Sequence, residues 1–135
     1  MKTLDVKFSF TFEKPEDEVF FAFSYPFSYE ENQKLMEKYE QMYSTDPDIY
    51  FHRELLIRSL QERDVDLITI SSHEGKLTEY ESTLDENLFP CLGEKPRARK
   101  FRTNKPVILI TARVHPGETP ASHTMNGILE FILDK

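Results

Sequence analysis

The sequence predicts an α/β fold that is preceded by a β-hairpin. Three patterns carry this prediction. Apolar and polar residues alternate from position 4 to position 12, which is the period of a strand buried on one face. Apolar residues recur at helical spacing between positions 29 and 43. Near the end of the chain an apolar run, a loop and a second helical pattern follow one another, as in α/β proteins.

Composition bounds the size and the partners of the protein. Its 135 residues, of which 39% are hydrophobic and 13% aromatic, are enough for one domain or for part of a larger one. The 17 basic and 24 acidic residues give a net charge of -7. This balance argues against a surface built as a whole for nucleic acid or for an anionic membrane.

Cysteine content and the start of the chain indicate the cellular compartment. Cys91 is the single cysteine, so no intrachain disulfide can form. The first residues lack the basic and apolar regions of a signal peptide. The longest apolar runs fall far short of the roughly 20 residues that a membrane-spanning helix needs. We therefore expect a soluble, cytoplasmic protein.

The first elements are a hairpin and a helix. The alternating segment 4–12 is followed by a turn at 14–17 and by a more continuously apolar run at 19–23, and such a hairpin needs further strands to be stable. Ser28 and Glu31 then have the spacing of a capping box, in which hydroxyl and carboxylate each satisfy a free backbone N–H. A helix is predicted from there to about Tyr43.

The middle of the chain predicts two strands and a long insertion. Residues 50–57 and 65–70 have strand-like patterns, separated by a polar connection at 61–64. Residues 72–104 contain two glycines and two prolines and little periodicity, so we expect a surface insertion without regular structure.

The last unit is predicted to be strand, loop and helix. The β-branched run 107–110 is typical of a central strand covered on both faces. Thr119 is the expected N-cap of the following helix, with Pro120 in its first turn. The chain then ends without a further strand to pair, so we expect the sequence to be truncated. The loop lies at the carboxyl end of the strand, where α/β proteins place their sites.

His115 and Glu118 are the candidate metal ligands in this loop. They supply a nitrogen and an oxygen donor three residues apart, which suits zinc. Pro116 stiffens the intervening turn, and Gly117 can adopt backbone angles that other residues avoid. A catalytic zinc usually has three protein ligands, so two do not make a site. The spacing alone is equally typical of a surface histidine near a carboxylate at a helix start.

Four segments resemble the cytosolic carboxypeptidases of the zinc metallocarboxypeptidase clan. Residues 111–120, Thr-Ala-Arg-Val-His-Pro-Gly-Glu-Thr-Pro, resemble the zinc signature of that family. Residues 23–29, 48–56 and 65–71 resemble it as well. Residues 48–56 and 65–71 are most similar to the subgroup that removes branch-point glutamates from polyglutamylated tubulin. The resemblance runs from about residue 20 to the end of the chain.

The resemblance implies a domain organisation and a site. Residues 1–24 would end an N-terminal β-sandwich domain, and residues 25–135 would form the first part of a carboxypeptidase catalytic domain, a mixed sheet with flanking helices. His115 and Glu118 would be the first two ligands of Zn²⁺. The third ligand, a histidine, would follow Lys135, as would the catalytic glutamate and the arginine that binds the substrate carboxylate.

The resemblance also implies an activity. The full-length protein would be an enzyme that removes glutamate from polyglutamylated tubulin or other glutamate-rich tails, in the cytoplasm, with the cytoskeleton, the cilium and the nucleus as further locations in the family. The 135-residue chain itself would be inactive. Two alternatives stay open: a non-catalytic fragment, and a module that binds tubulin tails without turnover. Neither nucleic acid nor a membrane is an expected partner.

Other candidate residues have simpler explanations. His123 could be a third ligand, but a helix-surface histidine is favoured, because its ring would have to reach back past the helix start. His52 and His73 are interpreted as structural or solvated, and Cys91 as incidental. Six cations lie within eleven residues, and a solvated loop is favoured over a surface that attracts glutamate-rich tails: Lys95, Arg97, Arg99, Lys100, Arg102 and Lys105.

Overall fold

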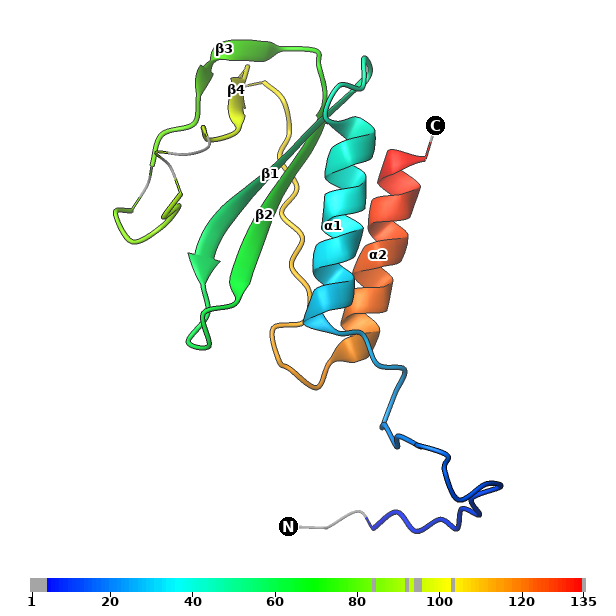
Figure 1. Cartoon of the computed structure of the whole chain (residues 1–135). Helices are drawn as coiled ribbons and strands as arrows, with labels where there is room; N and C mark the ends of the chain where they lie inside the picture. Colours follow the sequence, from blue (N-terminus) through cyan, green and yellow to red (C-terminus); the bar gives the residue numbers. More distant parts are fainter. Residues whose placement is uncertain (1–4, 84, 92, 94–95, 103, 135) are drawn as a thin grey trace.

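Two parallel helices pack on one side of a β-hairpin. The computed structural model describes residues 5–83, 85–91, 93, 96–102 and 104–134. Its elements are, in chain order, α1 (Tyr29–Tyr43), β1 (Ile49–Arg58), β2 (Asp64–Ser72), β3 (Lys76–Tyr80), β4 (Arg99–Phe101) and α2 (Thr119–Leu133). Figure 1 shows α1 and α2 side by side with their first turns at the same end of the molecule. The predicted mixture of helix and strand is confirmed.

The first helix forms as its sequence predicts. Ser28 Oγ accepts a hydrogen bond from the backbone N–H of Glu31, and the Glu31 carboxylate accepts one from the backbone N–H of Ser28 at 2.6 Å. This capping box satisfies two backbone groups that the first turn leaves without helical partners. The helix ends at Tyr43, and Met36 and Tyr39 are its buried residues.

The two predicted strands of the middle segment are also confirmed. β1 and β2 pair antiparallel, with Tyr50 opposite Ser71, and the register shifts once, between Leu55 and Ile57. In the connecting turn the N–H of Ser59 donates to the carbonyl of Arg63 at 2.9 Å. This hairpin is the platform on which both helices pack.

The core lies between the hairpin and the helices. Phe51 of β1 lies in one buried cluster with side chains of both helices, which consists of Met36, Tyr39, Phe51, Leu129 and Leu133. The Tyr43 hydroxyl donates to the Leu133 carbonyl at 3.0 Å, which ties the ends of α1 and α2 together. Burial of side chains of this size contributes roughly 1.5–3 kcal/mol each to folding. The same contacts fix where α2 lies relative to α1.

The predicted unstructured insertion at 72–104 is partly wrong. Within its described part, β3 and β4 pair antiparallel as a second, two-stranded sheet. β4 is held by a tertiary contact, because the Arg99 N–H donates to the Tyr50 hydroxyl at 2.8 Å and the Phe101 ring lies 5.4 Å from the Tyr50 ring. A three-residue strand stabilised in this way has too short a pattern to be read from the sequence.

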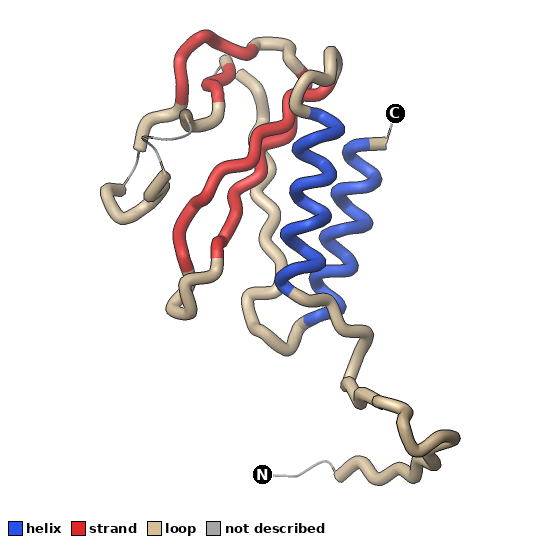
Figure 2. The backbone as a smooth tube through the Cα atoms, in the orientation of Figure 1, coloured by secondary structure: helices blue, strands red, loops and turns tan. Residues whose placement is uncertain are grey.

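The predicted N-terminal hairpin is not confirmed. Residues 5–28 contain no strand, although the expected turn forms, with the Asp17 N–H donating to the Lys14 carbonyl at 3.2 Å. The Phe8 and Phe21 rings meet across this turn at 5.0 Å. Both rings are more than half exposed, and Figure 2 shows the segment leading away from the helices. Without a sheet to join, such a pair of segments is marginal in water. Leu4 is outside the described residues.

The predicted strand at 107–110 does not form either. Val107, Ile108 and Leu109 are 91%, 83% and 78% exposed, and the segment is extended without being part of a sheet. A central strand needs neighbours on both edges, and the two described sheets contain only β1 with β2 and β3 with β4. Residues 107–110 therefore have the apolar pattern of a central strand but no paired strand in the described sheets. No described helix is long and apolar enough to cross a membrane.

The capping box gives a test of the fold. Replacing Ser28 by Ala should lower the free energy of unfolding by about 1 kcal/mol, because the backbone N–H of Glu31 loses its acceptor. Ser44→Ala is the matched control, since the Ser44 hydroxyl makes only a 3.5 Å contact at the other end of α1. Denaturant unfolding of the full-length protein measures both; equal effects would contradict the assignment.

The same cap should depend on pH. Hydrogen bonds from the Ser28 backbone N–H and side chain lower the pKa of Glu31 from its ordinary value of 4.5. A lowered carboxylate pKa stabilises the fold above the unfolded value and is lost as the pH falls through the folded one. The stability difference between the parent and Glu31→Ala should therefore be largest near neutral pH and shrink below pH 4.5. A pH-independent difference would argue against a charged cap.

Candidate functional site

The loop before α2 ends in a tight turn. The Glu118 N–H donates to the His115 carbonyl at 3.1 Å, which closes a four-residue turn with Pro116 in its second position. Proline is favoured there because its ring presets the backbone angle. Gly117 does not use a left-handed conformation, so the expectation that its special backbone freedom shapes the turn is wrong.

The helix start is arranged differently from the prediction. Glu118, not Thr119, occupies the N-cap position, and its side chain makes no capping bond. Pro120 lies in the first turn, as predicted. The Thr119 hydroxyl is instead hydrogen-bonded to the Ser24 hydroxyl, 95 residues earlier in the chain. The Glu118 carboxylate is thus free to point at the other candidate ligand.

His115 and Glu118 meet at this turn. The His115 Nδ1 atom lies 2.6 Å from Glu118 Oε1. Their side chains are 75% and 47% exposed, so solvent and small solutes reach both. The contact is local, because the turn itself brings positions three apart together. A nitrogen and a carboxylate oxygen converging on one exposed point are a donor pair of the kind that binds zinc.

Among the described residues, no third candidate ligand joins them. The described residues hold no group of three or more His, Cys, Asp or Glu side chains placed to share a metal ion. His123 lies on the exposed side of α2, and its ring contacts the Phe27 ring at a centroid distance of 5.5 Å. That contact gives His123 a packing role against the segment that leads into α1.

The other two histidines belong to the far end of the hairpin. His73 Nε2 lies 2.9 Å from the Asp46 carbonyl oxygen, and its Nδ1 lies 2.8 Å from Lys76 Nζ. The His52 ring stacks on the Tyr50 ring. Both histidines therefore take part in contacts that hold strands and turns in place. Burial raises the pKa of Tyr50 in the same cluster.

Three described cations of the basic segment 95–105 bind other groups of the chain. Arg97 is buried and forms an ion pair with Glu54 at 2.6 Å, and its guanidinium lies over the Phe89 ring. Arg99 donates to the Thr78 carbonyl, and Lys105 donates to the carbonyls of Ser72 and Glu74. Lys95 lies outside the described residues. Cys91 is half-buried and not in a disulfide. We expected a solvated loop here, but part of the segment is held by ion pairs and hydrogen bonds within the chain.

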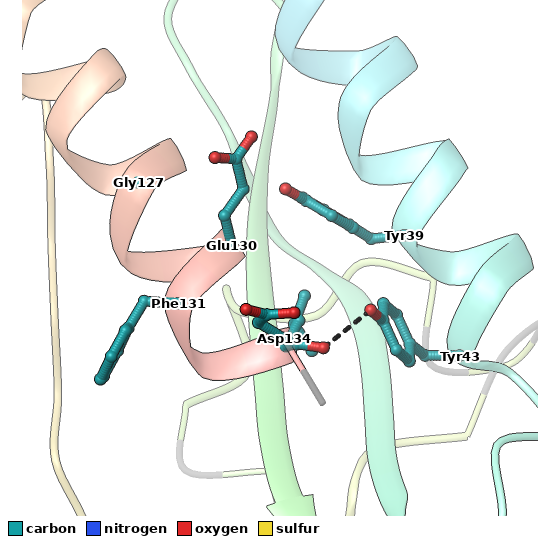
Figure 3. Close-up of a pocket in the computed structure, with 7 residues that line it drawn as sticks. Tyr39, Tyr43, Gly127, Glu130, Phe131 and Asp134 are labelled. Carbon is teal, nitrogen blue, oxygen red and sulfur yellow. Dashed lines mark hydrogen bonds between the residues drawn. The ribbon is translucent and has the colours of Figure 1, made fainter.

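A groove between the helix ends is separate from the turn. It has a volume of about 690 Å³ and is lined by Tyr39, Tyr43, Gly127, Glu130, Phe131, Leu133 and Asp134. Figure 3 shows these residues around the hydrogen bond from Tyr43 to the Leu133 carbonyl. The groove lies at the last turn of α2, whereas His115 and Glu118 precede its first turn. Burial raises the pKa of Tyr39.

Comparison with known proteins finds one family. The sequence model of the zinc carboxypeptidases matches residues 34–135. The chain is 47% identical over 122 residues to cytosolic carboxypeptidase-like protein 5 of Mus musculus, which is 84% of this chain and 13% of that protein. It is 45% identical over 126 residues to the Danio rerio protein of the same name, 86% of this chain and 14% of that one.

A second kind of relative matches over nearly the whole chain. Cytosolic carboxypeptidase 6 of Caenorhabditis elegans is 37% identical over 130 residues, which is 96% of this chain and 22% of that protein. The chain therefore spans between 13% and 22% of the length of these three relatives.

The Glu54–Arg97 pair gives a second test. Arg97→Ala should lower the free energy of unfolding by about 3–5 kcal/mol, because it leaves the Glu54 carboxylate buried without its partner. The control is Arg102→Ala, an exposed cation of the same segment, whose effect should stay within about 0.5 kcal/mol. Denaturant unfolding of the full-length protein compares them. A small effect of Arg97→Ala would show that the pair is not buried in solution.

Proposed function

Because the chain belongs to the zinc carboxypeptidase family, we propose that the full-length protein is a cytoplasmic, zinc-dependent carboxypeptidase that removes glutamate from polyglutamylated proteins such as tubulin. The observation that carries this proposal is the convergence of His115 Nδ1 and Glu118 Oε1 at 2.6 Å on an exposed turn. The names of the relatives, cytosolic carboxypeptidases, support carboxypeptidase activity in the cytosol.

The two side chains fit a zinc ion in their chemistry. An imidazole nitrogen and a carboxylate oxygen are among the ligands that zinc prefers. They lie in hydrogen-bond contact, and both would hold the ion as metal ligands do, through donor atoms that carry no proton. A catalytic zinc takes three protein ligands, and we propose that the third lies outside these 135 residues.

The roles of the chain's own residues follow from their positions. When bound, zinc lowers the pKa of a coordinated water and polarises the scissile carbonyl. His115 and Glu118 hold the metal, and the Pro116 turn fixes their spacing. α2 carries the turn on a packed helix, through Leu129 and Leu133 in the core. The general base and the group that binds the substrate carboxylate are proposed to lie outside this chain.

Glutamate as the substrate rests on the resemblance of the sequence. Residues 48–56 and 65–71, which resemble the branch-point subgroup, are strands β1 and β2 rather than the turn. They therefore support a family assignment, and none of their residues is a proposed metal ligand. The alternative, a module that binds glutamate-rich tails without turnover, is weakened because Arg97, Arg99 and Lys105 are engaged inside the chain.

A glutamate-release assay tests the proposal. The full-length protein is assayed with peptides that carry α-linked and branch-linked glutamates. His115→Ala and Glu118→Gln should each lower release by at least about 100-fold, because even outer-shell partners of a metal account for about 10–100-fold. The matched control is His73→Ala, whose hydrogen bonds lie at the other end of the hairpin. It should leave the rate unchanged.

Three outcomes separate the alternatives. Release from branch-linked peptides supports the branch-point subgroup, and release from α-linked peptides alone assigns a chain-shortening enzyme. Zinc binding without release from either peptide would contradict the enzyme and favour the binding module. Full activity of His115→Ala or Glu118→Gln would refute the proposed ligands.

A further inference from the structure

Arg113, two residues before His115, has an unusual backbone. Its φ of 55° lies in the left-handed region, which non-glycine residues seldom occupy. Among the described residues, Glu62 and Phe89 are the other non-glycine residues with positive φ. Such a conformation costs of order 1–3 kcal/mol and persists where surrounding contacts hold it. The contacts of the Arg113 side chain supply that restraint.

The Arg113 guanidinium joins the turn to the entry of α1. Its Nε and Nη2 atoms donate to the Pro116 carbonyl at 3.2 and 3.1 Å. Its Nη1 atom donates to the Phe27 carbonyl, 86 residues away in the sequence. Pro116 lies between the two candidate ligands, so hydrogen bonds to its carbonyl hold the turn itself in place. The planar guanidinium serves two acceptors at once, which one ammonium group does not reproduce.

Two further contacts run between the same segments. The Ser24 hydroxyl is hydrogen-bonded to the Thr119 hydroxyl, and the Phe27 ring packs against the His123 ring. Residues 24–27 thus contact the loop and the start of α2 at three places. Figure 1 shows why this is possible: α1 and α2 begin at the same end of the molecule. The turn is exposed to solvent, but the segment before α1 holds it in place through these contacts.

We propose that Arg113 is a positioning residue that holds the His115–Glu118 turn in its metal-binding arrangement by anchoring the Pro116 carbonyl to the Phe27 carbonyl. The proposal rests on the proposed function, because it takes His115 and Glu118 to be metal ligands. In this proposal Arg113 binds the Pro116 and Phe27 carbonyls and is not itself a ligand of the metal or the substrate. It acts by keeping two exposed side chains convergent before the metal arrives, which reduces the ordering required on binding.

Variants of Arg113 separate the side chain from the backbone. Arg113→Gly tolerates the left-handed conformation and removes the guanidinium. Arg113→Lys keeps the charge but loses the fork, that is, the planar guanidinium that donates to two carbonyls at once. The matched control is Glu62→Gly, which relieves the same φ of 55° in the turn between β1 and β2. All variants are made in the full-length protein, and circular dichroism verifies that they fold.

The readout is zinc affinity, measured by competition with a chromophoric chelator. Arg113→Gly and Arg113→Lys should each lower it by about 10–100-fold, the usual effect of removing a partner that orients a metal ligand. Glu62→Gly should bind as the parent does. In the metal-free protein, amide hydrogen exchange at residues 115–118 should accelerate in Arg113→Gly while exchange in α1 stays unchanged.

Defined results would overturn the proposal. Zinc affinity within about twofold of the parent in Arg113→Gly would exclude a positioning role, and full affinity in Arg113→Lys would exclude the fork. If Arg113→Gly does not fold, Arg113→Lys alone decides. His115→Ala distinguishes failure of the underlying function, because parental zinc affinity in that variant would refute the ligand assignment whatever Arg113 does.

Discussion

The packing of α2 against α1 and β1 is the contact on which the candidate site depends. Leu129 and Leu133 lie in the core with Tyr39 and Phe51, and this fixes the line along which α2 runs. Because the turn at residues 115–118 leads directly into α2, the position of the helix also sets the position of the turn. Its other attachment is the segment before α1, through Ser24 and Phe27. An exposed turn anchored at both sides can present two ligands without being buried.

The exposed apolar surface follows from the same architecture. The helices cover one side of the β1–β2 hairpin, and the core cluster they form with it is small. Residues 107–110 and Phe131 carry apolar side chains without cover among the described residues. Contiguous exposure of this kind is rare on soluble domains. The chain spans only 13–22% of the length of the relatives compared.

Local patterns could be predicted from the sequence and long-range ones could not. The capping box at Ser28, the strand-like patterns of β1 and β2 and the meeting of His115 with Glu118 all depend on residues close together in the sequence. The strand expected at 107–110 depends on pairing partners that its own sequence does not specify. β4 depends on Tyr50, far away in the chain. The Arg113 fork binds two backbone carbonyls, and these carry no sequence signal.

The central claim is that His115 and Glu118 bind zinc together. Anomalous diffraction from crystals of the full-length protein, collected on both sides of the zinc absorption edge, tests it most directly. The account predicts an edge-dependent peak within coordination distance, about 2.0–2.2 Å, of His115 Nδ1 and a Glu118 carboxylate oxygen. A zinc peak bound elsewhere, or occupied metal that leaves the 2.6 Å contact between these two side chains intact, would contradict it.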